Sequence, residues 1–567
     1  MRRHYTAPMS DAATDAMLVD ASSPRRGRGA LTALGAFAIY LMASVVVWGG
    51  SAVTRLGTYY ITRQDSPDPY FFRWAMTWVP WAIAHGRDPL VTDVIYAPYP
   101  VTLTWVTLAP GPAIAMWPVT RAFGSLVSYN VLTLLAPALA GWAAFLLCRR
   151  LTHRFWASLA GGLFFGFSTF IANQMNHPNL ALAFPIPLLV YLVVRRLEGS
   201  LRRWMFIVLV GVTLVALWSI SLELFATTTV FGGIAMLIAL IIAREDRPKL
   251  WSTTLQIGVG YAIAGAVVFV PYLLPALQTA PQAVMRDNER SSDPLQLFFP
   301  ENRYVVEGAW LQEMGARYKG HVYVGFGIIA VLIGFAITEW RRRWARALLV
   351  FIGICILFAM GPTLWVGGHS TIPLPMSILR KLPLLQQAIP SRIIVFAYLG
   401  VAVVVATWLA AARGRGVWIR VGVVLVAITL GIPAIQIPPW HMPDATPAFF
   451  TDGSYRSLIT AGETVLVIPR QAAQPMSWQA TADFWFRMPN GYVGITTQGV
   501  TRDPVNGRLA GSGRLPSGEE LRTWLDRHGV TAIVVEDVVL GHFEPALEAA
   551  GFGLVQQIGG VSVWRPV

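Results

Sequence analysis

ALTALGAFAIYLMASVVVWGGSAV, residues 30–53, contains no charged side chain. A helix of about 20 apolar residues crosses the hydrocarbon core of a bilayer, so this run is long enough to span a membrane. It also exceeds the apolar region of a cleaved signal peptide, and we therefore expect it to be retained as an anchor. Residues 1–29 before it are polar and rich in Ala, Ser and Arg, which predicts a disordered cytoplasmic segment.

Comparable apolar runs recur along most of the chain. They cover residues 126–148, 155–173, 178–194, 204–222, 224–243, 251–275, 320–339, 346–366, 389–412 and 416–436. Of the 567 residues, 55% are hydrophobic and only 13% are charged, whereas soluble domains carry about a quarter charged residues. The composition excludes a soluble globular protein. It predicts a polytopic α-helical membrane protein with about 11 transmembrane helices.

The positive charges indicate the orientation of these helices. Lys and Arg account for a net charge of +14 and stand in short clusters between apolar runs, at residues 149–150, 195–203, 244–249, 341–346 and 413–420. Such clusters stay on the cytoplasmic side of a membrane. All these clusters are cytoplasmic here under two conditions: the N-terminus is cytoplasmic, and residues 101–123 form a helix on the outer surface instead of a span. Pro110, Pro112 and Pro118 interrupt residues 101–123 and disfavour a spanning helix there. Clusters so placed face the lipid bilayer, and no basic–aromatic module predicts a nucleic-acid partner.

The composition changes near Ile437. Residues 437–567 combine β-rich runs such as GETVLVIPR (462–470) with an amphipathic helical pattern in LRTWLDRHG (521–529). We therefore predict three parts, a cytoplasmic segment 1–29, a transmembrane domain 30–436 with its first outer loop at 54–125, and an extracytoplasmic α/β domain 437–567. Three aromatic rings of the last part, those of Trp478, Trp485 and Tyr492, are suited either to stacking on sugars or to packing in a core.

Isolated ionisable side chains near membrane helices are costly and mark candidate functional sites. In the predicted topology they gather on the outer side. They are Asp65 and Asp68 in the first outer loop, His177 in the turn NQMNHPN (residues 173–179), Glu223 between two apolar runs, and Arg380, Lys381 and Arg392 around the start of the tenth run. Glu223 is expected either to bind sugar hydroxyls or to pair with one of the arginines, because an unpaired carboxylate there is costly.

The first outer loop contains aromatic residues at helical spacing. They are Tyr70, Phe71, Trp74, Trp78 and Trp81. This pattern predicts a helix lying in the headgroup zone of the membrane. Asp68 precedes Pro69, which predicts extended backbone at Asp68 and an N-cap role for its carboxylate. The two cysteines, Cys148 and Cys355, lie within apolar runs and are expected to be buried as small hydrophobic residues.

Several segments together resemble the GT-C superfamily of integral-membrane glycosyltransferases, in particular an actinobacterial-type set that uses polyprenyl-phosphate sugars. They include DPYFFRW (68–74), HGRDPL (85–90), HPNL (177–180), AIPSRI (388–393) and WQATADFWFRMPNGYVG (478–494). The likeness covers about residues 30–500. It implies the GT-C fold and a general base in the first outer loop. Asp68 matches that position, and Asp65 is the close alternative.

The resemblance implies transfer of a sugar, arabinofuranose or mannose, from a polyprenyl-phosphate donor to a glycan or glycolipid acceptor of the cell envelope, outside the cytoplasmic membrane. The leaving phosphate needs fixed positive charge, for which Arg392 is the first candidate, with Arg380 and Lys381 as second choices; His177 is a further candidate substrate ligand. The sequence predicts no specific cofactor, because its acidic residues form no metal-ligand pattern. Some relatives use a divalent cation, so the resemblance leaves the binding of one possible here. Two alternatives are a transporter or flippase of lipid-linked glycans and a non-catalytic scaffold for envelope assembly.

Overall fold

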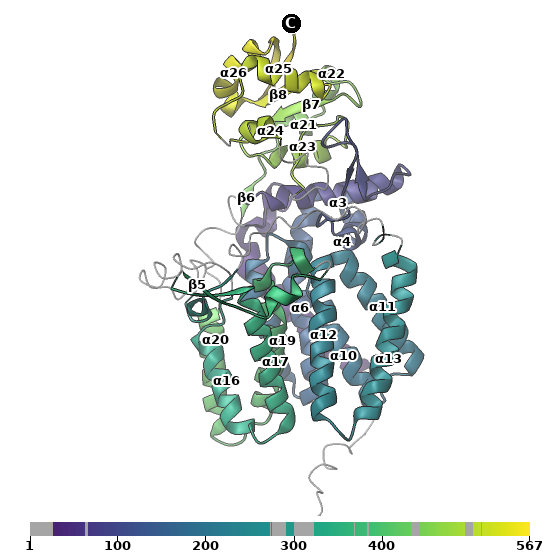
Figure 1. Ribbon diagram of the computed structural model, residues 1–567, viewed down its shortest axis with the longest axis vertical. Helices are drawn as coiled ribbons and strands as arrows, with labels where there is room; N and C mark the ends of the chain where they lie inside the picture. Colours follow the sequence, from purple (N-terminus) through teal and green to yellow (C-terminus); the bar gives the residue numbers. More distant parts are fainter. Residues whose placement is uncertain are drawn as a thin grey trace, which may run out of the picture.

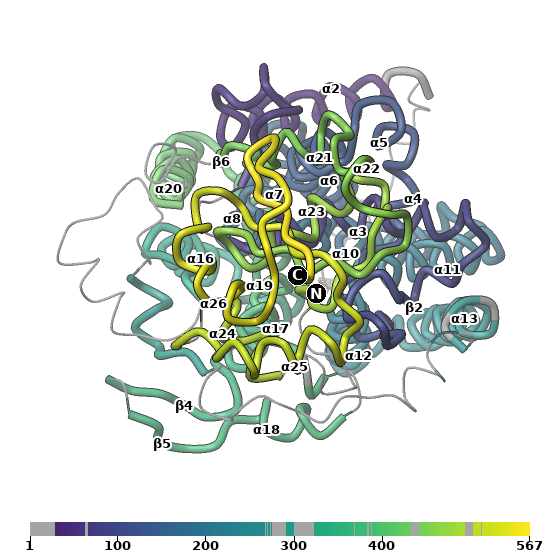
Figure 2. Tube along the Cα trace, turned by 90° about the horizontal axis from the view of Figure 1, so that it is seen from above, coloured from purple at the N-terminus to yellow at the C-terminus, as the bar shows by residue number. Residues whose placement is uncertain are grey.

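A bundle of long helices carries an α/β unit at one end (Figure 1). The computed structural model describes residues 26–62, 66–274 except 271 and 273, 291–299, 322–431 except 368, 383 and 384, 441–493, and 503–567 except 512. Asp65 lies outside the described residues, as does the predicted cytoplasmic segment up to residue 25. Seen along the bundle, the α/β unit lies over its centre, and the hairpin of β4 (Thr363–Val366) and β5 (His369–Pro373) stands at the edge (Figure 2).

The apolar runs of the sequence form the helices of the bundle. These are α2 (Arg26–Ser44), continued by η1 (Val45–Gly49) and η2 (Gly50–Arg55), α6 (Ser125–Thr152), α7 (Phe155–Gly166), α8 (Thr169–Asn173), α9 (Pro178–Ala181), α10 (Pro185–Leu197), α11 (Arg203–Ile220), α12 (Leu222–Ile242), α13 (Arg247–Ala264), continued by η3 (Gly265–Phe269), α16 (Phe326–Glu339), α17 (Arg343–Ala359), η7 (Pro390–Ile393), α19 (Ile394–Ala410) and α20 (Gly416–Gly431). Cys148 on α6 and Cys355 on α17 are buried with free thiols.

Seven helical stretches within the described residues are long and apolar enough to cross a membrane. Helices α13, α16, α17 and α20, which correspond to the other four apolar runs, have 18, 14, 17 and 16 residues. The chain is therefore a multi-pass helical membrane protein, as its composition predicted. The number of eleven spans stays a prediction.

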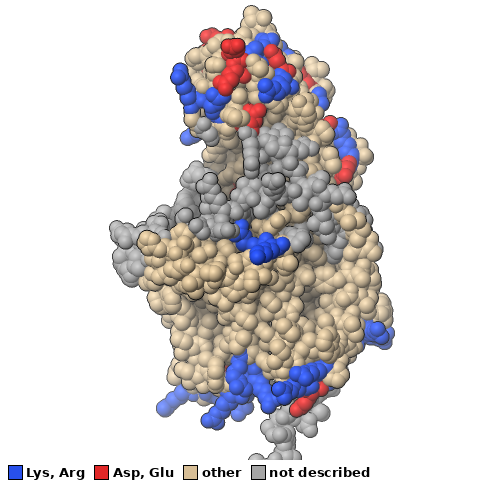
Figure 3. All heavy atoms as spheres, in the orientation of Figure 1, with Lys and Arg blue, Asp and Glu red and all other residues tan. Residues whose placement is uncertain are grey.

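Basic side chains gather at the end of the bundle away from the α/β unit (Figure 3). Exposed ones there include Arg202, Arg341, Arg342 and Arg413 in connections between helices of the bundle, and Arg203 at the start of α11. The α/β unit carries charges of both signs on the visible face. This asymmetry is the one expected if the basic end faces the cytoplasm.

Residues 101–123 form no spanning helix. After strand β3 (Val101–Thr102) they form two short helices, α4 (Pro110–Ala115) and α5 (Trp117–Phe123), where the sequence predicted a single helix on the outer surface. Each of the two helices has a proline in its first turn, where the missing N–H costs no hydrogen bond. Helix α4 packs beneath α3 (Asp68–Ala84), at the end of the bundle that carries the α/β unit.

Helix α3 lies across this end of the bundle, between the transmembrane helices and the α/β unit (Figure 1). The spacing of its aromatic residues predicted a helix with these rings in the headgroup zone, but the rings of Trp74 and Trp78 are completely buried within the protein. Their rings stack on each other with centroids 5.4 Å apart, and the indole N–H of Trp74 donates to Oε1 of Gln479 across 2.9 Å. The α/β unit covers the helix face that the sequence alone assigned to lipid.

The α/β unit contains a four-stranded sheet with the strand order β7–β8–β10–β9. Strand β7 (Val465–Ile468) runs parallel to β8 (Ala532–Glu536), and β10 (Val561–Pro566) pairs antiparallel with both β8 and β9 (Phe552–Ile558). Alternate residues of a strand face opposite sides. Val465 and Val467 accordingly pack toward α3 and α23 (Gln474–Thr481), whereas Leu466 and Ile468 pack toward α25 (Gly518–Arg527) and α26 (Leu540–Ala549).

Candidate functional site

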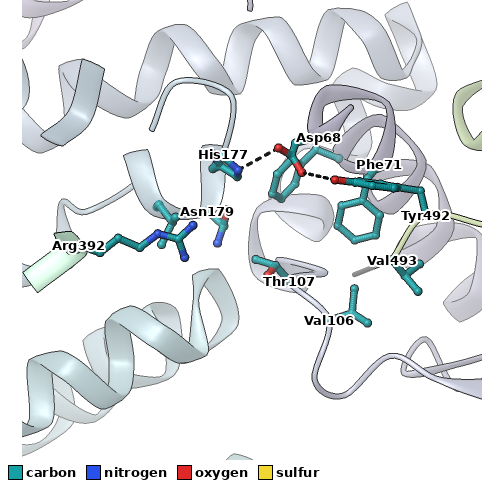
Figure 4. A pocket seen from close by; sticks show the side chains of 11 residues that line it. Asp68, Phe71, Val106, Thr107, His177, Asn179, Arg392, Tyr492 and Val493 are labelled. Carbon is teal, nitrogen blue, oxygen red and sulfur yellow. Dashed lines mark hydrogen bonds and ion pairs between the residues drawn. The ribbon is translucent and has the colours of Figure 1, made fainter. Parts of the chain in front are cut away.

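A pocket opens where α3, the turn before α9, η7 and the α/β unit meet (Figure 4). Its volume is about 460 Å³, including the part that is open to solvent. It is lined by Asp68, Phe71, Phe72, Val106, Thr107, His177, Asn179, Leu180, Arg392, Tyr492 and Val493. Three of the side chains that the sequence singled out, Asp68, His177 and Arg392, thus share one pocket.

Asp68 is the first residue of α3, and Pro67 occupies the N-cap position. The backbone of Asp68 is therefore helical rather than extended, and the N-cap position belongs to Pro67 and not to Asp68, contrary to both sequence expectations. The carboxylate instead meets side chains from two distant segments. Oδ2 lies 3.0 Å from Nε2 of His177, and Oδ1 accepts a hydrogen bond from the hydroxyl of Tyr492 across 3.3 Å (Figure 4).

These contacts set the charge of the Asp68 carboxyl. Burial raises its pKa, but the hydrogen bonds from His177, Tyr492 and Ser66 and the charge of His177 outweigh burial, so the pKa lies below its ordinary value. Asp68 is consequently ionised at neutral pH. A carboxylate only accepts hydrogen bonds, so Nε2 of His177 carries the proton between the two groups.

Arg392 reaches the pocket from η7, on the side opposite Asp68 (Figure 4). Its Nη1 forms an ion pair with Oε2 of Glu223, and Oε1 of Glu223 accepts from the backbone N–H of Ile389 across 2.9 Å. Glu223 was expected either to bind sugar hydroxyls or to pair with an arginine, and in the structure it pairs with Arg392. A guanidinium has five N–H donors, and the single carboxylate oxygen of Glu223 does not occupy all of them. Arg392 can therefore contact both Glu223 and an anion in the pocket.

Polar atoms beside the pocket have no partner among the described residues. They are Nδ1 of His177 and Oδ1 of Asn179, both buried. A buried polar atom without a hydrogen bond costs about 1–3 kcal/mol, so a polar ligand or water that reached these atoms would be stabilised. Asn179, which is 3% exposed and lines the pocket, was missed by the sequence argument, although it belongs to the same turn as His177.

The other sequence candidates lie elsewhere. Arg380 and Lys381 follow α18 (Met376–Leu379) and do not line the pocket. Trp478 is 1% exposed and belongs to the core, and the ring of Trp485 lies under the guanidinium of Arg456. Of the three aromatic rings proposed for sugar stacking, Tyr492 lines the pocket, where its hydroxyl is committed to Asp68.

The residues of the pocket do not suit a cation that requires several protein ligands. The part of the chain that the structure describes contains no group of three His, Cys, Asp or Glu side chains able to hold a metal ion. The pocket offers one carboxylate, that of Asp68, and one imidazole, that of His177. Ca²⁺ takes six to eight oxygen ligands, more than the side chains of this pocket supply.

Two glycosyltransferases of known structure have a similar architecture. The chain is similar to arabinofuranosyltransferase AftD from Mycobacteria, with a TM-score of 0.56 and 14% identity over 96% of this chain and 42% of that chain. It is also similar to the oligosaccharyltransferase of Archaeoglobus fulgidus, with a TM-score of 0.51 and 13% identity over 94% of this chain and 74% of that chain. This chain therefore spans less than half the length of AftD. The likenesses confirm the GT-C fold.

Sequence comparison points to one family. No curated protein matches the chain. The family model DUF6311, described as a domain of unknown function, matches residues 37–437. This range includes α3, His177 and Arg392 but ends before the α/β unit. Because the match covers more than half of the sequence, the chain belongs to the DUF6311 family.

Proposed function

We propose that the protein is an inverting glycosyltransferase that moves a sugar from a polyprenyl-phosphate donor to a glycan or glycolipid acceptor of the cell envelope. One observation carries the proposal. A single pocket combines an ionised carboxylate, Asp68, with a guanidinium, Arg392, contributed by a distant part of the chain. Glycosyl transfer from a phosphate needs both a proton acceptor and a stabiliser of negative charge.

In the proposed reaction, an acceptor hydroxyl lies within hydrogen-bond reach of Asp68. Its oxygen attacks the anomeric carbon while the proton passes to the carboxylate. The bond between the anomeric carbon and the phosphate oxygen breaks, and its electron pair leaves with that oxygen. Arg392 stabilises the departing phosphate through charge-assisted hydrogen bonds. Attack on the side opposite the leaving group inverts the anomeric configuration.

The unpartnered polar atoms suit a sugar as the group transferred. The buried amide of Asn179 offers a carbonyl oxygen and an NH₂ group within the pocket wall, and sugar hydroxyls both donate and accept hydrogen bonds. Phe71 and Phe72 add apolar surface beside these groups. Arabinofuranose and mannose are the sugars that we propose for this position, in line with the resemblance and with the activity named for AftD.

The arrangement of the molecule supports a site on the outer face of the cytoplasmic membrane. The pocket lies at the end of the bundle next to the α/β unit, and exposed basic clusters lie at the other end (Figures 1 and 3). Because basic connections stay in the cytoplasm, we place the pocket and residues 437–567 outside. A polyprenyl-phosphate donor would then enter the pocket from the outer leaflet.

The proposal is tested by replacing the gene with variants and comparing envelope glycans and lipids by mass spectrometry. Asp68→Asn keeps the size of the side chain but not its basicity, so we expect turnover to fall by about 10²- to 10⁴-fold and the glycan profile to match that of a deletion strain. Asp93→Asn is the matched control, because Asp93 lies in the same outer loop but pairs with Arg87 at the surface. A normal profile in the Asp68→Asn strain would exclude the proposed role of Asp68.

A further inference from the structure

Tyr492 belongs to the α/β unit, and its side chain reaches the carboxylate of Asp68 at the end of the helix bundle. Its hydroxyl donates to Oδ1 of Asp68, 424 residues away in sequence. Figure 4 shows the phenol ring entering from one side of Asp68 and His177 approaching from the other. Tyr492 lies outside the residues that match the family model, which end at 437.

The segment that carries Tyr492 is firmly attached to the first outer loop. The N–H of Met488 donates to the carbonyl of Val94 across 2.8 Å, and the N–H of Ala97 donates to the carbonyl of Met488 across 2.9 Å. The hydroxyl of Tyr96 donates to the carbonyl of Gly491 across 2.7 Å. A Cβ at Gly491 would lie 3.2 Å from the ring of Tyr96, so the two chains are in close contact directly before Tyr492.

We propose that Tyr492 is a positioning residue of the site, which holds one oxygen of Asp68 while His177 holds the other. With Oδ1 bound by the phenol and Oδ2 by the imidazole, the carboxylate cannot rotate about its terminal bond. Each carboxylate oxygen has two lone pairs. The hydroxyl of Ser66, 3.4 Å away, also donates to Oδ2, so the second lone pair of Oδ1 stays available for the acceptor hydroxyl. The inference rests on the proposed role of Asp68 as the base, and it makes the α/β unit part of the site.

The phenol is suited to a constant donor role. Burial and the negative charge of Asp68 raise the pKa of Tyr492 well above its ordinary value, so the hydroxyl keeps its proton throughout the physiological pH range. Its hydrogen bond in turn helps to hold the pKa of Asp68 down. Loss of this one hydroxyl should therefore make Asp68 easier to protonate, an effect that a purely structural tyrosine would not have.

The experiment measures protonation of Asp68 without any substrate. Dicyclohexylcarbodiimide modifies protonated carboxyl groups, and peptide mass spectrometry quantifies the modification of Asp68 in isolated membranes as a function of pH. In Tyr492→Phe we expect labelling of Asp68 to be about 2- to 10-fold faster than in the wild type, over the pH range where the wild-type rate falls. This factor corresponds to the loss of one hydrogen bond. Tyr96→Phe is the matched control, since it removes a hydroxyl that anchors the same segment but does not touch Asp68.

A wild-type labelling curve in Tyr492→Phe would overturn the inference, and so would an equal shift in both variants, which would indicate a general loosening of the segment. Should Tyr492→Phe fail to fold, 3-fluorotyrosine placed at position 492 keeps the ring and hydroxyl. Its more acidic phenol is a stronger donor, and labelling of Asp68 should become slower; unchanged labelling would contradict the inference. Because no substrate is involved, this result is independent of whether Asp68→Asn abolishes glycosyl transfer.

Discussion

Arg73 on α3 forms a buried ion pair with Asp444 at the start of the α/β unit, with Nη1 2.8 Å from Oδ2. The same guanidinium donates to the hydroxyl of Tyr60 across 2.9 Å, to that of Thr481 across 2.9 Å and to that of Ser125 across 3.1 Å. One side chain thereby connects the first outer loop, the start of α6 and the α/β unit. This connection fixes α3, which presents Asp68 to the pocket.

Replacement of Arg73 by Met should destabilise the protein. The variant leaves the carboxylate of Asp444 buried without its partner, which costs about 3–5 kcal/mol when one member of a buried pair is removed. We expect a clear drop in the temperature of unfolding of the purified protein in detergent. Arg87→Met is the control, because the pair of Arg87 and Asp93 is exposed and contributes about 1 kcal/mol or less. Equal effects of the two substitutions would show that the Arg73 pair has no special role.

Replacement of Arg392 by Lys should weaken the binding of a polyprenyl phosphate. The lysine keeps the positive charge but loses the planar group that can contact Glu223 and a phosphate together, and we expect about a 10-fold loss of affinity. Tryptophan fluorescence during titration with the lipid in detergent provides the measurement. Arg380→Lys, outside the pocket lining, should leave the affinity unchanged.

Glu223→Gln should act in the opposite direction. The amide still accepts the hydrogen bond from Ile389 but no longer neutralises Arg392, so the phosphate should bind more tightly. Tighter binding in this variant together with weaker binding in Arg392→Lys is the pattern expected of a phosphate ligand. Unchanged affinity in both variants would remove Arg392 from the proposed site.

Asp483→Asn should stabilise the protein at neutral pH. The neighbouring atoms partly desolvate Asp483 and raise its pKa, although the residue is exposed and His85 and Arg456 attract its charge. The ionised form is therefore slightly less favourable in the folded state than in the unfolded one, by an amount that solvent screening keeps small. The charge of Asp483 thus lowers the free energy of unfolding at neutral pH. This loss disappears as the pH falls, because the carboxyl becomes protonated in both states. The gain in unfolding temperature should therefore be present at pH 7 and disappear below about pH 4, near the ordinary aspartate pKa.

The substitution is otherwise mild, because Asp483 has a φ of 52° and Asn tolerates this left-handed backbone conformation. Thermal unfolding at pH 7 and at about pH 3, below the ordinary aspartate pKa, compares the variant with the wild type. A stabilisation of the same size at both pH values would mean that the charge is not its source.

Cysteine labelling should place the α/β unit outside the cell. Val538→Cys in η9 (Asp537–Val539), where Val538 is 73% exposed, should react with an impermeant maleimide in intact cells. Ser200→Cys, an exposed position in the connection between α10 and α11, should react only after lysis. Both native cysteines are buried, so background labelling should be low. The reverse pattern would invert the proposed orientation and move the pocket to the cytoplasm.

The sequence by itself determined that the chain is a multi-pass helical membrane protein. Apolar runs such as residues 30–53 and 389–412 are local features, and partitioning between water and lipid depends on the composition of each run, largely independent of its neighbours. The same holds for the basic clusters, which the structure exposes at one end of the bundle. Local patterns therefore predicted the class of fold, and the motif resemblance predicted the GT-C fold.

Tertiary structure decided which of the predicted residues meet. Asp68, His177 and Arg392 were candidates because isolated ionisable groups are costly near a membrane, but Arg380 and Lys381 met the same criterion and lie outside the pocket. Asn179 carries no charge, and Tyr492 is one of several aromatic residues in its segment, so the sequence distinguishes neither as a residue of this pocket. The aromatic face of α3 was assigned to the headgroup zone, because its spacing is the same whether lipid or protein covers it. Hydropathy measures how strongly a side chain avoids water, but it does not distinguish burial in lipid from burial in protein. Contacts such as that between Asp68 and Tyr492 depend on the packing of the whole chain.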